Sequence, residues 1–532
     1  MAIPGSHASA VKMTRHKFHY AYHFTVYLFV FFCLRAVQWT HMKFGSLTID
    51  QIFFHMNFGG EMLLKVDRAL VISGVKNVLL VPLVLALLAL ALDIRLSNRA
   101  RRSGARQPRE PDYQPPHPAM RFIRFLTARR APLLILAGST FLLYSISAFS
   151  YLRARYTDND YLAQHYLDPR SVPVQAANPR NLVLVYVESL EETYADSALF
   201  GDDLLKSLHG LGGTSFAHYR QMPGTGWTMA GIVGTQCGIP LKDILGGDRN
   251  KDESAPDNHA FNRRVGPSLR SFLPGAVCLG DILKEQGYTN VFIGGASLRF
   301  AGKGTFFLGH HYDQAWGLEE LGGAGLNLDD ANGWGYLDYQ VLADARARVR
   351  ELHDSGQPFN LTVLTLDTHG PDGLLSRECR ARGAGDYAGI VRCTADQVAE
   401  FVQFIRDNGY LRDTRVVILG DHLAMRNPLY ERLERAGSRD IFNLFIADTP
   451  IRTNRDTIVH FDLLPTLLEF IGFQVAGGRL GLGYSGISEP ADAIPADRIQ
   501  RMLAELPNRS DRYWSFWKAP ASAEGPPETT IH

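Results

Sequence analysis

The sequence predicts an α/β protein in which N-terminal transmembrane helices precede a mostly parallel sheet covered by helices on both faces. Apolar residues concentrate in three stretches before residue 152, and short apolar runs alternate with helical patterns after it. Strands that alternate with helices are typical of βαβ units, which build parallel sheets. We expect a membrane anchor over 1–152, a juxtamembrane linker over 153–180, an α/β domain over 181–500 and a C-terminal tail over 501–532.

The three apolar stretches, at 20–39, 75–92 and 131–151, are each close to the length that crosses a bilayer as a helix. Arg35 is the one charge inside the first stretch, near its far end, where a long side chain can reach the interface. A cleaved signal peptide is the alternative for this stretch, but the tripeptide QWT at 38–40 is a poor cleavage site. The pattern therefore predicts three spanning helices.

Positive charge sets the expected orientation of these helices. Segment 95–130 carries ten arginines, and Lys12, Arg15 and Lys17 precede the first stretch. Because excess Lys and Arg marks the cytoplasmic side, everything after residue 152 is expected outside the cytoplasm. A nucleic-acid patch is the alternative for the arginines, but their position between two apolar stretches favours topology. The formal charge of the whole chain is only +1, so no nucleic-acid partner is expected.

The cysteines agree with an external domain. Cys33 lies in the first apolar stretch, which leaves Cys237, Cys278, Cys379 and Cys393 in the part expected outside the cytoplasm. An even number of cysteines in an oxidising compartment suggests two disulfides. The sequence leaves their pairing open, and proximity along the chain favours Cys237–Cys278 and Cys379–Cys393.

The elements of the α/β domain follow from periodicity and capping. Continuous apolar runs, typical of strands covered on both faces, predict the strands 181–187, 291–293, 361–366, 416–419 and 442–446. Amphipathic patterns between them predict helices at 278–286 and 339–352. The capping box Thr394-Ala-Asp-Gln397 predicts the start of a further helix that ends near Gly409.

Polar residues stand directly after three of the predicted strands: Glu188, the segment 367–369 (DTH) and the segment 420–422 (GDH). In sheets of this kind ligands bind beyond the carboxyl ends of the strands. Asp421 and His422 follow a strand and a glycine that allows a sharp turn. An adjacent carboxylate and imidazole can reach one divalent ion, and Glu188 supplies a second carboxylate. The pattern predicts a metal site at this edge.

A nucleophile is expected near the same metal. The segment 224–228 (GTGWT) leads into an apolar helical pattern, so Thr228 would stand at a helix N-terminus. Free backbone N–H groups and the helix dipole there stabilise a bound phosphate and the charge of its transition state. The alternatives are that Thr228 merely caps the helix, or that Thr225 on the same turn is the nucleophile.

Six runs of sequence carry a specific resemblance: NLVLVYVESLEETY, MPGTGWTMAGIVGTQCGIPL, GGASLRFAGKGTFFLGHHYD, LTLDTHGP, LGDHL and VHFDLLPTLLEFIGF. They resemble the phosphoglycerol transferases that modify osmoregulated periplasmic glucans, within the alkaline phosphatase/sulfatase superfamily, and their relative lipoteichoic acid synthase. The resemblance implies a sulfatase-like fold over 181–500. It also implies one metal held by Glu188, Thr228, Asp421 and His422, most suitably Mn²⁺, with Zn²⁺ or Mg²⁺ also possible.

The resemblance also suggests residues that touch the substrate. His369 matches a histidine that contacts the transferred group and could protonate the leaving alkoxide, although an ordinary turn histidine is the alternative. Lys303 stands where lipoteichoic acid synthase has a phosphate-binding arginine. His310 is a weaker candidate, because His310-His311 replaces an expected His-Gly. Trp227 could pack against a glycerol or a sugar, or belong to the core.

The implied reaction is transfer of phosphoglycerol from phosphatidylglycerol to a periplasmic glucan through a threonine-linked intermediate, with diacylglycerol released. The implied location is the bacterial inner membrane, with several spans and a periplasmic catalytic domain. Rival interpretations are a phosphoethanolamine transferase acting on lipid A or glucan, a membrane-bound phosphodiesterase and a non-enzymatic sensor. A formylglycine sulfatase is not expected, because the segment 237–241 (CGIPL) lacks the required spacing and arginine. The oligomeric state is open.

Overall fold

The structure is a computed structural model. It describes residues 6–45, 49, 52, 68–104, 130–157, 159–242, 271–327 and 333–518. The chain divides into two compact units: one comprises 1–48 and 67–149, and the other comprises 49–66 and 150–532. Each unit is described by itself below.

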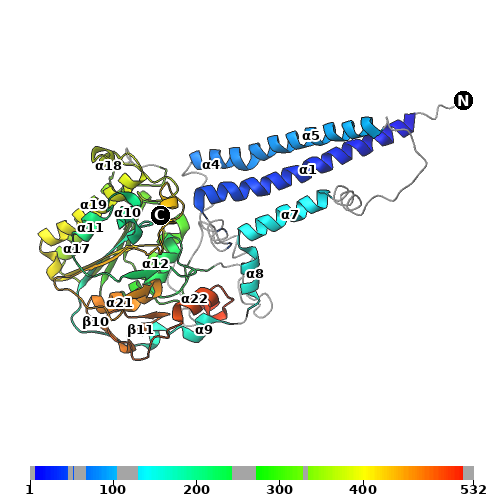
Figure 1. Ribbon diagram of the computed structural model, residues 1–532. Helices are drawn as coiled ribbons and strands as arrows, with labels where there is room; N and C mark the ends of the chain where they lie inside the picture. Colours follow the sequence, from blue (N-terminus) through cyan, green and yellow to red (C-terminus); the bar gives the residue numbers. More distant parts are fainter. Residues whose placement is uncertain are drawn as a thin grey trace. The chain divides into compact units, whose positions relative to one another are not determined.

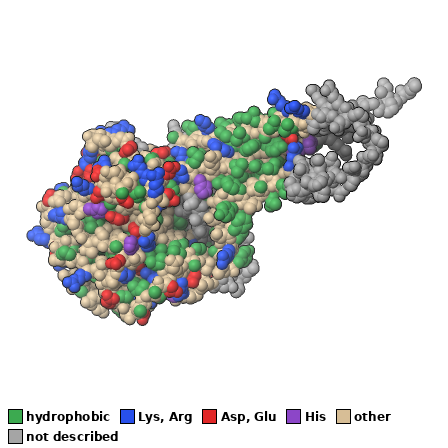
Figure 2. Space-filling model, in the orientation of Figure 1, with side chains coloured by type: hydrophobic (Ala, Val, Ile, Leu, Met, Phe, Trp, Pro, Cys, Tyr) green, Lys and Arg blue, Asp and Glu red, His purple; other side chains and the backbone are tan. Residues whose placement is uncertain are grey.

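The first unit is helical. Its elements are α1 (Ser6–Phe44), α4 (Arg68–Gly74), the π-helical turn η1 (Val75–Leu80), α5 (Val81–Gly104) and α7 (Arg130–Ser145). Helix α1 contacts both α5 and α7. Large apolar side chains point outward along these helices, and Figure 2 shows hydrophobic side chains covering them.

Two helices among the described residues are long and apolar enough to cross a membrane: Phe18–Phe44 and Ala69–Arg99. They contain the first two predicted spans. The third prediction, 131–151, coincides with α7 followed by α8 (Ala148–Arg155), and the pair is bent by 68° at its break. The two helices count as a third span only if they are taken together. Ser147 at this break has a φ of 57°, which no apolar pattern could have indicated.

The second unit is built on a six-stranded sheet with the order β5-β4-β6-β2-β7-β8. Its strands are β2 (Asn181–Val187), β4 (Thr289–Gly294), β5 (Gln314–Trp316), β6 (Phe359–Leu364), β7 (Thr414–Gly420) and β8 (Asn443–Ile446). Neighbouring strands are parallel except that β8 runs antiparallel to β7. The prediction of a mostly parallel sheet is confirmed, and the predicted strand 181–187 coincides with the central strand β2.

Helices cover both faces of this sheet, as predicted (Figure 1). On one face, Val183, Val185 and Val187 of β2 share a core with α17 (Asp338–Asp354) and α19 (Tyr387–Asp407). On the other face, alternate residues of β2 share a core with four helices. These are α12 (Thr228–Cys237), α14 (Leu279–Glu285), α15 (Lys303–Gly309) and α21 (Leu463–Phe470).

The start of α19 corrects the capping-box prediction. The helix begins at Tyr387, where the Asp386 side chain accepts a hydrogen bond from the amide of Gly389. Thr394 therefore lies inside the helix, and its hydroxyl donates to Asp338 Oδ2 at 2.9 Å. A side chain that resembles a cap in the sequence here serves a tertiary contact instead.

Shorter elements complete the second unit. Three two-stranded sheets pair β1 (Val174–Ala176) with β10 (Phe473–Val475), β3 (His218–Arg220) with β9 (Thr457–Val459), and β11 (Arg479–Leu480) with β12 (Gly483–Tyr484). Short helices are α9 (Tyr161–His165), α10 (Ser197–Phe200), α11 (Lys206–His209), α16 (Leu318–Gly323), α18 (Arg377–Ala381), α20 (Tyr430–Leu433), α22 (Arg498–Glu505) and α23 (Asp511–Ser515). Helix α22 extends into the predicted tail 501–532 and α23 lies within it, and because Met502 and Tyr513 are buried, residues up to 518 belong to the folded unit. Residues 519–532 lie outside the described part.

Both predicted disulfide pairings are confirmed. Cys237 at the end of α12 is bonded to Cys278, and Cys379 of α18 is bonded to Cys393 of α19.

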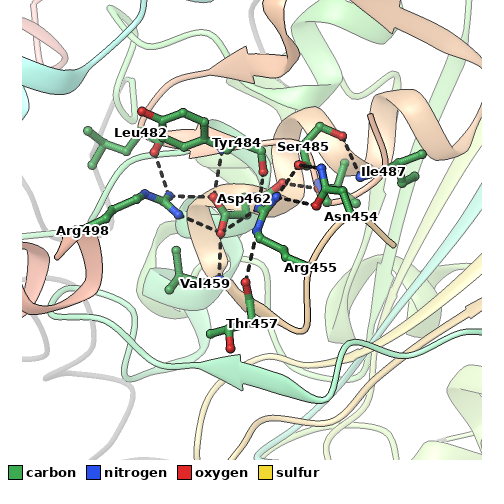
Figure 3. Close-up of polar contacts among 12 residues, drawn as sticks. Asn454, Arg455, Thr457, Val459, Asp462, Leu482, Tyr484, Ser485, Ile487 and Arg498 are labelled. Atoms are coloured by element: carbon green, nitrogen blue, oxygen red, sulfur yellow. Dashed lines mark hydrogen bonds and ion pairs between the residues drawn. The ribbon is translucent and has the colours of Figure 1, made fainter. Parts of the chain in front are cut away.

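A buried ion-pair group, centred on Asp462 before α21, connects distant parts of the chain (Figure 3). Arg498 of α22 donates to both carboxylate oxygens of Asp462, at 2.6 and 3.1 Å, and Arg455 lies 3.3 Å away. The amides of Val459 and Tyr484 donate to the same carboxylate. Asp462 is fully buried, and both of its oxygens are hydrogen-bonded.

Candidate metal centre and nucleophile

The functional residues gather at the carboxyl edge of the sheet. Glu188 directly follows β2, and Asp421 and His422 directly follow β7, the strand next to β2. Because the two strands are parallel and in register from Asn181 to Val187, their ends meet at the same height. The three side chains, called the metal group below, therefore come together as the sequence predicted.

The metal group is compact and buried. The ligand atoms of Glu188, Asp421 and His422 lie within 4.8 Å of one another. His422 Nε2 is 3.4 Å from Glu188 Oε1 and 3.5 Å from Asp421 Oδ2. The hydroxyl of Thr228 donates to Glu188 Oε2 at 3.1 Å, which attaches the predicted nucleophile to the same group. All four predicted metal ligands are thus assembled in one place.

Neighbouring groups hold these side chains in orientation. Asp421 Oδ1 accepts hydrogen bonds from the amides of Ser189, at 2.7 Å, and His422, at 2.9 Å. The Ser189 hydroxyl donates to Glu188 Oε1 at 2.8 Å. The ring nitrogen Nδ1 of His422 lies 2.8 Å from the carbonyl oxygen of Leu423, to which it donates, so that Nε2 faces the carboxylates.

Two atoms of the metal group have no hydrogen-bond partner among the described residues, although both are buried: Asp421 Oδ2 and His422 Nε2. Buried polar atoms are normally hydrogen-bonded, so unsatisfied ones that face each other need an explanation. A divalent cation between them would satisfy both. Two carboxylates, one imidazole and one hydroxyl suit Mn²⁺ or Zn²⁺, and the residues therefore fit a divalent metal.

The electrostatics of the group also suit a cation. Burial, together with the charge of Glu188, raises the pKa of Asp421 to about 7. Burial would also raise the pKa of Glu188, but contact with His422 and the positive charge of nearby histidines hold that pKa below its usual value. Burial lowers the pKa of His422, whereas the charges of Asp421 and Glu188 outweigh this and raise it to about 9. Without a metal, protons must offset the crowded negative charge, and metal binding would release them.

Helix α12 places the nucleophile by close packing. Thr228 is its first residue, and the N-cap position is taken by Trp227 without a side-chain hydrogen bond. The geometry therefore does not support the alternative in which Thr228 only caps the helix. Gly231, one turn later, lies against the carbonyl of Asp421, where an added Cβ would come within 2.0 Å of that oxygen. Only glycine permits this approach, which brings the helix start up to the metal group.

Thr225, the alternative nucleophile on the same turn, forms hydrogen bonds within that turn and not with the metal group. Thr225 is fully buried, and its hydroxyl both accepts from the amide of Met222 and donates to the carbonyl of Met222. This is a local turn contact, which satisfies the hydroxyl away from the metal group. The arrangement favours Thr228 over Thr225.

A pocket opens beside the nucleophile. Its lining includes Glu188, Thr228, Lys303, His369, Phe300 and Trp334. Lys303 begins α15, is 4% exposed, and its ammonium lies over the Phe300 ring, 4.8 Å from the centroid. The rings of His369 and Trp334 are 4.4 Å apart between centroids. The predicted substrate residues Lys303 and His369 thus do face the predicted nucleophile.

Burial changes the protonation of both groups. It lowers the pKa of Lys303 to about 8, although the charges of Glu188 and Asp421 act in the opposite direction. It also lowers the pKa of His369, again against the charge of Glu188. Near neutral pH the pocket therefore contains a charged lysine and a neutral imidazole.

The loop that carries His369 is fixed by a pair of carboxylates. Asp338 Oδ1 accepts from the amides of Leu366 and Asp367, and Asp367 Oδ1 accepts from the amide of Asp338. Burial raises the pKa of Asp367 well above its usual value, with the charge of Asp338 contributing. Although Asp367 follows β6 as the sequence analysis noted, it orients this loop and does not join the metal group.

Two predicted substrate residues lie away from the pocket lining. His310 contacts Asp281 Oδ2 at 2.8 Å and the carbonyl oxygen of Phe272 at 3.1 Å, so both ring nitrogens serve packing around α14 and α15. Trp227 is 5% exposed and belongs to the hydrophobic core beside α12. The alternative interpretation of Trp227 as a core residue fits this position.

The sequence predicted no contact for four pocket or support residues, Phe300, Trp334, Thr365 and Thr368, although Thr368 lies in the segment 367–369 that follows a predicted strand. Thr365 accepts from the Glu188 amide at 3.0 Å, and the Thr368 hydroxyl donates to the Glu188 carbonyl. Their position after β6, the other neighbour of β2, could have indicated this role. Trp334 lies in no predicted strand or helix, so no pattern in the sequence pointed to it.

The fold and the site together define the class of protein. A hydroxyl at the start of a buried helix, hydrogen-bonded within a group of two carboxylates and an imidazole at the edge of a parallel sheet, is an arrangement suited to metal-assisted attack by that hydroxyl.

Comparison with known proteins gives the family. The chain belongs to the Sulfatase family, whose model matches residues 180–473. It is 37% identical over 381 residues to "Phosphoglycerol transferase I" of Escherichia coli O127:H6, and 36% identical to the protein of the same name from Citrobacter koseri. Each alignment covers 69% of this chain and 46% of the relative, so the chain spans about half the length of these relatives. Among solved structures, the lipoteichoic acid synthase LtaP of Listeria monocytogenes matches with 16% identity and a TM-score of 0.43, covering 59% of this chain and 79% of LtaP.

Proposed function

We propose that the protein transfers phosphoglycerol from phosphatidylglycerol to a periplasmic glucan, with Thr228 as the nucleophile. One observation carries the proposal: the Thr228 hydroxyl donates a hydrogen bond to Glu188 inside a buried group in which Asp421 Oδ2 and His422 Nε2 have no hydrogen-bond partner among the described residues. The similarity to Phosphoglycerol transferase I supports the nature of the transferred group.

The proposed cofactor is one Mn²⁺ held by Glu188, Thr228, Asp421 and His422. When bound, such an ion lowers the pKa of a coordinated hydroxyl and neutralises charge on a phosphoryl oxygen. Manganese is proposed over Zn²⁺ and Mg²⁺ because three oxygen donors accompany a single imidazole.

In the first step, the Thr228 oxygen attacks the phosphorus of the lipid. The hydroxyl proton leaves along the existing hydrogen bond to Glu188 and passes to solvent. A bond forms between the Thr228 oxygen and phosphorus, and the bond between phosphorus and the diacylglycerol oxygen breaks. That oxygen takes its proton from His369. The ring is neutral in the free enzyme because burial lowers its pKa, and the negative charge of a bound phosphodiester would raise this pKa and supply the acid form.

In the second step, a glucan hydroxyl attacks the same phosphorus. His369, now neutral, accepts the hydroxyl proton, and the bond between phosphorus and the Thr228 oxygen breaks. The Thr228 oxygen takes up a proton from solvent by way of Glu188, which restores the hydrogen bond between them. His369 releases its proton to solvent when the charged product leaves. Lys303 would hold a phosphoryl oxygen through both steps, since its ammonium faces the pocket and makes no ion pair with any described residue.

The charge of the pocket favours glycerol over ethanolamine. Glu188 is the single carboxylate among the described lining residues, and the metal would occupy it. The other charged group is the Lys303 ammonium, which already lies over the Phe300 ring. An ethanolamine head group would bring a second cation into this space without a free carboxylate to receive it, whereas a glycerol head group is neutral.

The proposed location is a bacterial inner membrane, with several spanning helices. The second unit, which holds the proposed site and is called the catalytic unit below, would lie in the periplasm. Two helices of sufficient length and apolarity support the anchor. The two disulfides in the catalytic unit support an oxidising compartment for it.

The test compares release of diacylglycerol from labelled phosphatidylglycerol by the full-length protein with Mn²⁺, with and without glucan. Wild type should release it and Thr228→Ala should not, whereas Thr225→Ser, which keeps the turn hydroxyl, should retain activity. Mass spectrometry should find the glycerophosphate adduct on Thr228. Turnover of phosphatidylethanolamine in place of phosphatidylglycerol would overturn the choice of head group, release without transfer to any glucan would indicate a phosphodiesterase, and activity in Thr228→Ala would overturn the nucleophile.

A further inference from the structure

The helical unit contains two polar clusters inside its apolar stretches, and they differ in charge. In the first, Arg130 forms a two-pronged ion pair with Asp93, at 2.8 Å for both contacts. The hydroxyl of Tyr27 donates to the same carboxylate at 3.2 Å. The positive and negative charges cancel, which is how charges are usually accommodated between apolar helices.

The second cluster is centred on Arg35 of α1 and has no carboxylate among the described residues. Arg35 donates through Nη2 to Asn77 Oδ1 at 2.7 Å and through Nη1 to Gln38 Oε1 at 2.6 Å. Its Nε is buried and has no hydrogen-bond partner among the described residues. The guanidinium is therefore held by neutral oxygens, and its charge is not compensated.

The local backbone is shaped around this arginine. Asn77 lies on the π-helical turn η1, and its amide group donates to the carbonyl of Ser73 at 2.9 Å. That bond directs Asn77 Oδ1 toward Arg35. Trp39 donates to the Ser73 hydroxyl at 3.0 Å, and its ring packs against Gly74. Single π-helical turns inside α-helices frequently mark functional sites, and this one positions a hydrogen-bond acceptor for a cation.

A second cation lies on the same turn. Lys76 is exposed, and its side chain forms no ion pair or hydrogen bond with any residue that the structure describes. The residues around it, Val75, Leu79 and Leu80, are exposed apolar side chains at 45%, 54% and 53%, as expected where lipid chains surround a helix. Both cations stand near one end of their apolar stretches, 20–39 and 75–92. In a bilayer with a hydrocarbon core of about 30 Å, long cationic side chains at such positions can reach the lipid phosphates.

We propose that Arg35 and Lys76 bind the phosphodiester of an anionic phospholipid at the π-helical turn. Its non-bridging oxygens would accept hydrogen bonds from the guanidinium and the ammonium, and its acyl chains would cover the apolar residues of η1. A lipid is the occupant, and not a free phosphate, because the cations are surrounded by lipid-facing side chains. The site does not depend on the proposed phosphotransferase activity, so the two can fail separately.

The experiment is native mass spectrometry of the full-length protein released from nanodiscs that contain equal parts of phosphatidylglycerol and phosphatidylcholine. Wild type should retain phosphatidylglycerol in preference to phosphatidylcholine. Arg35→Gln and Lys76→Gln should each lower this preference by about fivefold. Arg95→Gln is the matched control, because it removes the same charge from an exposed position farther along α5 and should leave the preference unchanged.

Lys76 is exposed and forms no ion pair within the described part of the chain, so its substitution tests the site even if Arg35→Gln fails to fold. Equal retention of both lipids by wild type would overturn the proposal. So would an unchanged preference in the Lys76→Gln protein, or an equal loss in Arg95→Gln, which would indicate only a general attraction between the helices and anionic membranes.

Discussion

Two buried charged groups in the catalytic unit differ in whether their polar atoms are satisfied. Around Asp462, both carboxylate oxygens receive hydrogen bonds from Arg498 and from backbone amides (Figure 3). In the metal group, Asp421 Oδ2 and His422 Nε2 face each other, and neither has a hydrogen-bond partner among the described residues. The side chains of Asp462, Asp421 and His422 are all fully buried, so burial alone does not distinguish the two groups.

The difference separates a structural role from a functional one. A buried charge that is fully paired stabilises the fold as long as its partners remain, whereas unsatisfied buried atoms are unfavourable until something binds them. The Asp462 group therefore holds α22 against the rest of the unit, and the metal group leaves two polar atoms open to a ligand. Substitutions should affect stability in the first and activity in the second.

The largest expected effect is on activity. Asp421→Asn removes a proposed metal ligand, and we expect the rate of diacylglycerol release to fall by about 1,000-fold. Its Oδ1 can keep the two amide hydrogen bonds, and the like charge beside Glu188 disappears, so the metal-free protein should unfold at the same or a higher temperature than metal-free wild type. Thermal unfolding with and without Mn²⁺ measures this, and metal should raise the unfolding temperature only in wild type. A strongly destabilised metal-free variant would contradict the comparison.

The reciprocal substitution should act on stability. Asp462→Asn leaves Arg498 and Arg455 without a buried counter-charge, and we expect the free energy of unfolding of the catalytic unit to fall by about 3–5 kcal/mol. Denaturant titration measures the loss, and Asp448→Asn is the control. Asp448 pairs with Arg415 at a partly exposed position, so its substitution should cost less than about 1 kcal/mol. Well below its unfolding temperature, Asp462→Asn should still be active.

Lys303 resembles the metal group, because it is buried and forms no ion pair with any described residue. Its pKa allows its role to be tested by varying the pH. Because burial lowers this pKa to about 8, the charged form that binds phosphate is lost as pH rises through 8. The KM for phosphatidylglycerol should therefore rise above about pH 8 in wild type. Lys303→Arg stays charged and should show a flat KM up to about pH 9. Lys303→Met should show a high KM at every pH, and identical profiles for wild type and Lys303→Arg would contradict the assignment.

The smallest expected effect is at the aromatic wall of the pocket. Trp334→Leu should raise the KM for the donor lipid or the glucan by about tenfold and change kcat little, since it removes a packing surface and no reacting group. Trp316→Leu is the matched control, because Trp316 packs against Arg348 and is not part of the pocket lining. Equal effects of the two substitutions would indicate a general loss of stability.

The comparison also explains which parts of the site could be read from the sequence. Glu188 and the Asp421-His422 pair stand directly after apolar runs, and parallel strands bring such positions to one edge, so the metal group was predictable. Thr228 was predictable because it begins a buried helix. Asp462 and Arg498 are far apart in the sequence and follow no such rule, so their pairing was not foreseen.

The remaining differences have similar causes. The capping-box pattern at Thr394 was misleading because a tertiary contact with Asp338 uses the same hydroxyl. Trp334 and Phe300 reach the pocket from irregular segments, where periodicity carries no information. His310 sits next to a motif that suggested substrate binding, yet Asp281 and a backbone carbonyl occupy both of its nitrogens.

The order of strands in the sheet has a consequence for when the enzyme becomes competent. Strand β2, which ends at Glu188, pairs with β6 and β7, whose residues follow it by more than 170 positions. The chain must therefore be synthesised past His422 before the three side chains of the metal group can come together. A nascent or truncated chain that ends before β7 contains Glu188 and Thr228 but lacks Asp421 and His422. We therefore expect it to be inactive toward the phospholipids around its own helices.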